Sequence, residues 1–184
     1  MISLIKTASR KRRCSISLNV KTNSRIWSII AEKRWILTKF AERLKALIAE
    51  SEKKIADIAV DLGIAQQTLY SYRSGKTTAE YSSLIMLANY FKCSIDYIAG
   101  RTELDPEAEE KETFFRECPP FSVWLKEIFK KRKTSESRIC KIVLISRSRF
   151  HGWLSGKNEP SLPNLIKLAE YFDCTLDFLV GREG

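Results

Sequence analysis

The chain contains two copies of one sequence unit. From Phe40 onward the sequence aligns with itself without a gap, so that Phe40 lies over Phe121 and Leu44 over Leu125. Of 64 aligned positions 18 are identical, and the agreement is strongest where SLIMLANYFKCSIDYIAGR lies over NLIKLAEYFDCTLDFLVGR. A solenoid needs at least about three repeats to bury a continuous core, so two copies predict two tandem domains instead.

Within each copy, apolar residues recur at helical spacing and not in the alternation of a strand. Glycines stand where such helices must end, for example Gly63 and Gly100. We therefore expect an all-α fold of two tandem five-helix domains, over 38–102 and 121–184. In the first copy the pattern predicts helices over 40–48, 55–62, 65–72, 84–91 and 94–99.

Positive charge is concentrated ahead of the first copy. The chain has a net charge of +10, and ten Lys and Arg but only one acid, Glu32, precede Phe40. We interpret 1–37 as a basic N-terminal arm, partly disordered, with a helix near 26–37. Three interpretations of segment 1–25 stay open: a DNA-contacting arm, a targeting segment, or a stretch without selected structure.

An acidic segment, 103–120, separates the copies and carries seven acids against two bases. Its three prolines favour a linker, in which Phe114 and Phe115 could dock on a neighbouring domain. As a tether, such a linker would raise the local concentration of one domain near the binding site of the other.

Composition argues against several other classes of protein. No apolar run approaches the roughly 20 residues of a membrane span, so we expect a cytoplasmic protein without membrane contact. The five cysteines are widely spaced and the chain has one histidine, so we expect neither a metal site nor a cofactor. Cys93 and Cys174 occupy equivalent positions, where a small buried side chain is expected. The lone His151 leaves little acid–base machinery, and we expect no enzyme.

Each copy also carries an ordered set of motifs. In the first copy Ala59 lies within a helix, Gly63-Ile64 form a turn, and the helix over 65–72 precedes a Ser-Gly-Lys loop and a tail that reads LIMLANYFKCSIDYIAG. Ala59 is small where two helices cross closely, and Gly63 can adopt positive φ. This order resembles the helix-turn-helix of the phage repressor and Cro family, also called the xenobiotic-response-element type. The resemblance covers both copies, everything except arm and linker.

The resemblance implies lambda-repressor-like domains in a sequence-specific regulator of transcription, a repressor from a prokaryote or phage that binds double-stranded DNA. The helices over 65–72 and 146–153 would enter the major groove, where glutamine suits adenine and arginine suits guanine. Loop lysines would contact phosphates. The predicted contact residues are Gln66, Gln67, Thr68, Tyr70, Ser71, Arg73 and Lys76 in the first copy, and Arg147, Ser148, Arg149, His151 and Lys157 in the second, with Gly152 on the same outward face and Arg149 at its flank.

The second copy departs from the family pattern. Leu144 replaces the turn glycine, which implies either a different turn or a strain of about 1 kcal/mol. The family usually has a glutamine near the start of its second helix; Ile55 stands there in the first copy and Glu136 in the second. One copy could therefore have become a protein-binding module. The alternative function is a protein-interaction regulator, antitoxin-like or anti-repressor, with secondary DNA binding; a homodimer also stays open.

Overall fold

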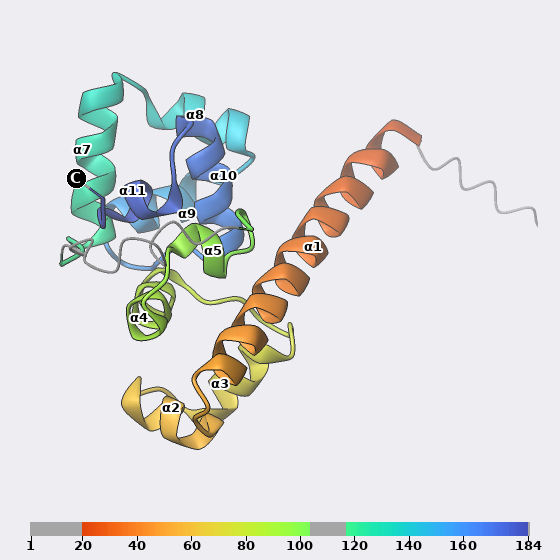
Figure 1. Ribbon diagram of the computed structural model, residues 1–184. Helices are drawn as coiled ribbons and strands as arrows, with labels where there is room; N and C mark the ends of the chain where they lie inside the picture. The colour runs from red at the N-terminus through yellow and green to blue at the C-terminus, as the bar shows by residue number, and fades with distance from the viewer. Residues whose placement is uncertain (1–19, 104–116, 184) are drawn as a thin grey trace, which may run out of the picture.

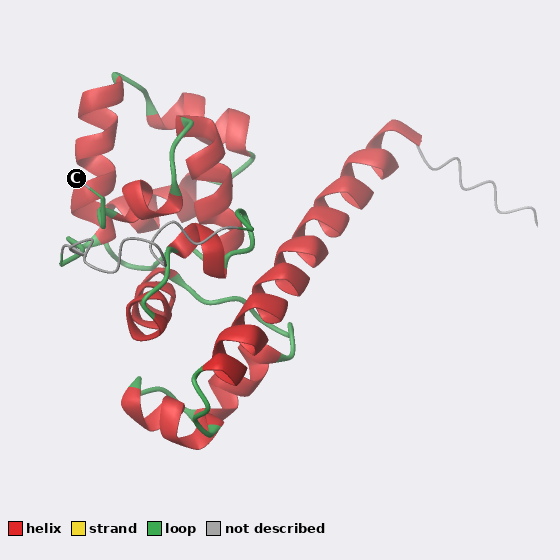
Figure 2. Ribbon diagram, viewed as in Figure 1, coloured by secondary structure: helices red, strands yellow, loops and turns green. Residues whose placement is uncertain are grey.

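A computed structural model describes residues 20–103 and 117–183 of the protein. Figures 1 and 2 show that these residues form helices and loops; the described ranges contain no strand, only an isolated bridge between Glu80 and Ser161. The all-helical prediction is confirmed. The first repeat comprises α1 (Val20–Glu50), α2 (Ile55–Asp61), α3 (Gln66–Arg73), α4 (Tyr81–Phe91) and α5 (Ile95–Ile98).

The second repeat reproduces this order. It comprises α7 (Phe121–Arg132), α8 (Glu136–Val143), α9 (Arg147–Leu154), α10 (Leu162–Phe172) and α11 (Leu176–Val180). The helices α8 to α11 begin at the residues that align with the first residues of α2 to α5. The offset between the sequence copies, which carries Phe40 onto Phe121, is therefore also a structural offset, and we call it the repeat offset.

The first helix is longer than the sequence predicted. We expected a helix near 26–37 and a separate one from Phe40, but α1 is continuous from Val20 to Glu50 because this segment contains neither glycine nor proline to interrupt it. Ile36, Phe40 and Leu44 recur at every fourth position and are all buried. The expected boundary at residue 37 is therefore corrected, since Ile36 already belongs to the core. The predicted disorder before Val20 lies outside the described residues.

Figure 1 shows that the N-terminal part of α1 runs well past the helices that pack on its C-terminal end, which include α3. Within the first repeat α1 contacts α3 and α5, as α7 contacts α9 and α11 in the second. This packing leaves one face of α3 and one face of α9 uncovered by the rest of their own repeats.

The two repeats share one hydrophobic core. A single cluster of buried side chains includes residues of both, and α4 packs on α10 as α5 packs on α11. The two domains are therefore held together by this core, and not only by the linker, which we expected from the sequence to act as a tether. Phe114 and Phe115, for which docking was considered, lie outside the described residues.

Candidate nucleic-acid interface

The turn between α2 and α3 sets the direction of α3. Ala59 is buried, and its carbonyl accepts a hydrogen bond from the Ile64 amide at 3.0 Å. Gly63 adopts φ +64°, in the left-handed region that favours glycine. On α3, Leu69 and Tyr72 face the core, and the Tyr72 ring meets Phe40 edge-on with 6.0 Å between centroids. These contacts fix which side of α3 faces outward.

The outward side of α3 is polar and free of acids. Gln66, Gln67, Tyr70 and Arg73 are exposed, whereas Thr68 and Ser71 are half-buried. The Ser71 hydroxyl donates to the Gln67 carbonyl at 2.9 Å, so its proton is used inside the helix. Gln66 and Gln67 begin the helix side by side with their side-chain amides in solvent. The predicted residues of the first repeat thus lie together, with the two glutamines the most accessible amides.

The second repeat keeps the turn although it lacks the glycine. Leu144 adopts φ 57° and ψ 43°, close to the φ of Gly63, so of the two expected alternatives the strained one occurs. The Leu144 side chain is 72% exposed and contributes little burial to offset this strain. The Ile145 amide donates to the Cys140 carbonyl at 3.2 Å, which reproduces the bond from Ile64 to Ala59. The connection into α9 therefore matches the connection into α3.

The outward side of α9 carries cations in place of amides. Arg147, Ser148, Arg149 and His151 are exposed, while Phe150 and Trp153 are buried. Arg147 donates to the Ser137 hydroxyl at 3.1 Å, a contact across the turn to α8. Four of the five predicted residues of this repeat are therefore exposed on α9: Arg147, Ser148 and His151 share one face, and Arg149 lies at its flank.

Gly152 does not belong to that face, contrary to the prediction from the sequence. It is buried, and a Cβ atom placed on it would lie 2.0 Å from the Asn158 Oδ1 atom. The Asn158 side chain, from the following loop, occupies the space that a side chain at 152 would need. A larger residue at position 152 would require the exposed Asn158 side chain to move away, so a loop side chain and not open solvent lies beside this position.

Both loops after these helices have the same backbone. Gly75 and Gly156 adopt φ +70° and +71°, and both following lysines are exposed. The Lys76 amide donates to the Ser71 carbonyl at 3.0 Å, and the Lys157 amide donates to the Gly152 carbonyl at 2.9 Å. The two lysines therefore stand at equivalent places beside their helices, where an ammonium group can neutralise a phosphate.

A hollow of about 180 Å³ beside α9 adds basic residues that sequence reasoning did not predict. Its lining includes Arg149, Lys33 from the extended part of α1, and Lys167 from α10, together with Glu32. Arg149 of the second repeat thus lies next to the helix that begins the first. The basic excess before Phe40 signalled the charge of this segment, but periodicity could not show which repeat it approaches.

The four cysteines that the structure describes show no arrangement for metal chemistry. No group of three or more His, Cys, Asp or Glu that could hold a metal ion occurs within residues 20–103 and 117–183. Cys93 is buried and Cys174 half-buried, close to the expectation for small core side chains. Burial raises the pKa of the Cys174 thiol to about 11, so little thiolate is present at neutral pH.

In the described residues, 20–103 and 117–183, no helix is long and apolar enough to cross a membrane.

Comparison with known proteins agrees with this geometry. A helix-turn-helix family model matches the chain twice, over residues 44–98 and 125–179. The HTH-type transcriptional regulator AnsR of Bacillus subtilis (strain 168) is 41% identical over 59 residues, 32% of this chain and 51% of that protein, so the chain spans about half the length of this relative. No solved structure matches significantly. The two family matches cover more than half of the chain, which therefore belongs to the helix-turn-helix family of the Cro/C1 type, in two tandem copies.

Proposed function

We propose that this protein is a sequence-specific DNA-binding regulator of transcription that acts as a repressor. The observation that carries the proposal is the pair of exposed, acid-free faces on α3 and α9, each on a helix whose opposite face is buried in the core. Core packing fixes the orientation of both helices, so their outward side chains are presented without a large ordering cost. Similarity to a protein named as a transcriptional regulator supports the same function.

The two helices read DNA through different groups. Gln66 and Gln67 start α3, and a glutamine amide can donate to and accept from the edge of adenine in one plane. Arg147 and Arg149 start α9, and arginine is the commonest reader of guanine. Lys76 and Lys157 contact phosphates beside each helix, which positions the protein without specifying sequence. Repression then follows from occupying DNA that the transcription machinery needs.

The test begins with selection of bound sequences from a random DNA pool with the full chain. The selected duplex is then titrated with wild-type protein and with a Gln66→Ala, Gln67→Ala double variant. Removing each bidentate hydrogen-bond pair should reduce discrimination between the selected and the mutated base by about 5- to 150-fold, the equivalent of about 1–3 kcal/mol. Unfolding should be unchanged, because both glutamines are exposed.

Asn89→Ala is the matched control, since it removes an exposed side-chain amide from α4. It should leave discrimination unchanged. An equal decrease in affinity for all sequences in the double variant would show that the glutamines position the protein and do not read bases. If the wild-type chain selects no sequence and binds DNA only weakly at physiological salt, the proposal is refuted and the protein-interaction function gains support.

A further inference from the structure

The contact between the repeats joins each segment to its own equivalent. The Tyr81 amide donates to the Pro160 carbonyl at 3.0 Å, and the Leu162 amide donates to the Ala79 carbonyl at 3.1 Å. The repeat offset carries Tyr81 onto Leu162 and Ala79 onto Pro160, so the two donors are equivalent residues and so are the two acceptors. The two bonds are therefore one interaction made twice, in opposite directions, around the bridge between Glu80 and Ser161.

A second set of contacts has the same reciprocity. Asp177 accepts a hydrogen bond from the Ile95 amide at 2.8 Å, and Asp96 accepts one from the Leu176 amide at 2.6 Å. Each aspartate thus satisfies the first amide of the short last helix of the other repeat. Each also pairs with an arginine of its own repeat, Asp96 with Arg101 and Asp177 with Arg182. These four side chains are again related by the repeat offset.

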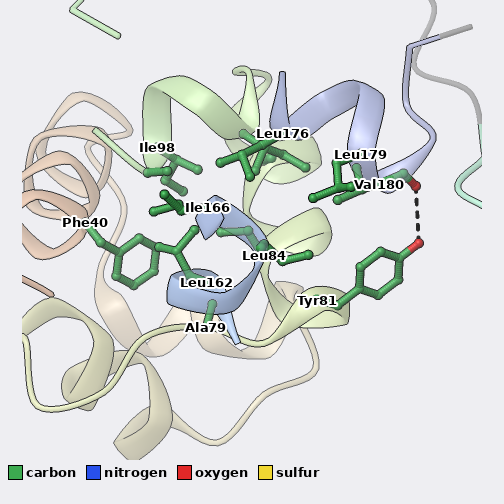
Figure 3. Packing of buried hydrophobic residues seen from close by; sticks show 14 of the residues in the cluster. Phe40, Ala79, Tyr81, Leu84, Ile98, Leu162, Ile166, Leu176, Leu179 and Val180 are labelled. Atoms are coloured by element: carbon green, nitrogen blue, oxygen red, sulfur yellow. Dashed lines mark hydrogen bonds between the residues drawn. The ribbon is translucent and has the colours of Figure 1, made fainter. Parts of the chain in front are cut away.

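Apolar side chains fill the space between these polar contacts. Figure 3 shows Leu84 and Ile98 of the first repeat beside Leu162, Leu176 and Leu179 of the second; all five are fully buried. The Tyr81 hydroxyl lies 2.7 Å from the Pro119 carbonyl and 3.3 Å from that of Val180, the bond drawn in Figure 3. The interface therefore resembles the interior of a domain more than a transient contact.

Reciprocal contacts, in which each residue of one half meets the equivalent of its partner's contact in the other half, are the property of an isologous, two-fold interface. Here both halves of that interface are on one chain. The operation that superimposes one repeat on the other also carries α3 onto α9. The helices α3 and α9, which the proposed function makes the two recognition helices, are therefore related by an approximate two-fold axis. Their separation is fixed by the shared core instead of by segment 103–120.

From this symmetry, and resting on the proposed function, we propose that one chain is the complete DNA-binding unit and occupies two inverted half-sites of different sequence. A two-fold protein requires half-sites in inverted orientation, at a spacing set by the protein. The half-sites differ because Gln66 and Gln67 on one recognition helix correspond to Arg147 and Ser148 on the other. A protein made of two identical chains would read the same half-site twice.

The test uses the operator selected by the intact chain. Its half-sites are rebuilt in inverted and in direct orientation. In the inverted form the spacer between the half-sites is also lengthened by half a helical turn and by a full turn, about 5 and about 10 base pairs. The inverted, unlengthened duplex should bind at least about tenfold more tightly than the others, because only there can both helices engage at once. Analytical ultracentrifugation of the complex should give one chain per duplex.

A second variant separates a packed pair from a tethered one. A short run of Gly and Ser is inserted within 104–116, and the duplex series is measured again. Unchanged orientation and spacing preference is the expected result, because the interface and not the linker sets the geometry. A broadened preference in this variant, equal binding of direct and inverted sites by the wild-type chain, or two chains per duplex would each overturn the proposal.

These outcomes are distinguishable from failure of the proposed function. If the chain reads no sequence at all, selection yields no operator and the DNA-binding function itself is wrong. If an operator is found and Gln66→Ala with Gln67→Ala weakens only one of its half-sites, the function stands and the duplex series decides the arrangement alone. Circular dichroism of the insertion variant, matched to the wild type, shows that both repeats remain folded.

Discussion

Gly63→Ala isolates the energetic effect of the turn between α2 and α3. Gly63 has φ +64°, and a Cβ atom placed on it meets nothing within 4 Å. The substitution therefore adds backbone strain without steric overlap. Leu144, at the equivalent position with φ 57°, shows that the same turn accepts a side chain without changing its course. We expect the α2–α3 geometry to persist in the variant.

The magnitude follows from two opposing effects. Placing an L-residue in the left-handed region costs about 1–2 kcal/mol. Alanine is also less flexible than glycine in the unfolded chain, which offsets about 0.4–1 kcal/mol of that cost. The free energy of unfolding should therefore fall by about 1 kcal/mol, a decrease in Tm of about 2–4 °C for a cooperative unit of this size. Urea titration followed by circular dichroism measures it.

Gly100→Ala is the matched comparison. Gly100 also has positive φ, +72°, but its Cβ would lie 2.8 Å from the Lys39 Cβ on α1. Overlap adds to strain there, so the free energy of unfolding should fall by about 1–3 kcal/mol more than in Gly63→Ala. If both variants are destabilised equally, or if Gly63→Ala is not destabilised at all, the separation of strain from overlap at these turns is refuted.

Two further predictions concern charge. Burial raises the pKa of Asp177 to about 6 despite its pairing with Arg182, so the folded state holds the proton more tightly than the unfolded chain, where the value is 3.8. The stabilisation of the folded state by this proton is therefore fully present below about pH 4 and is lost as the pH rises through about 6. Asp177→Asn should remove this pH-dependent difference in urea titrations, and identical pH profiles would contradict the assignment. Lys76→Ala should weaken binding to all duplexes alike and reduce the log–log salt slope by about one; a decrease confined to one sequence would show base reading instead.

Much of the scaffold could be predicted from the sequence because its determinants are local. Helical periodicity placed Leu69 and Tyr72 on the buried side of α3, and this left Gln66 and Gln67 exposed. The glycine at position 63 predicted a turn with positive φ, because other residues are strained in that conformation. The repeat offset then transferred each assignment from the first copy to the second, from α3 to α9.

Other features depended on contacts that periodicity cannot reveal. Gly152 looked like part of an outward face, yet the Asn158 side chain from the next loop covers it. The helix expected before Phe40 is continuous with the one after it. The spacing of apolar residues could not show this, because it does not reveal whether two neighbouring apolar stripes belong to one helix. Lys33 approaches Arg149 only because α1 extends past its own repeat.

The sequence by itself determined that the chain carries the same helical unit twice and that the two outward faces differ in chemistry. Only the tertiary structure decided how the two units are joined. The sequence of one repeat could not show that Asp96 accepts a hydrogen bond across the interface, because the amide that donates to it belongs to Leu176 in the other repeat. The reciprocal interface forms only when both copies are folded and packed together, so it could not be predicted from the sequence of either copy alone.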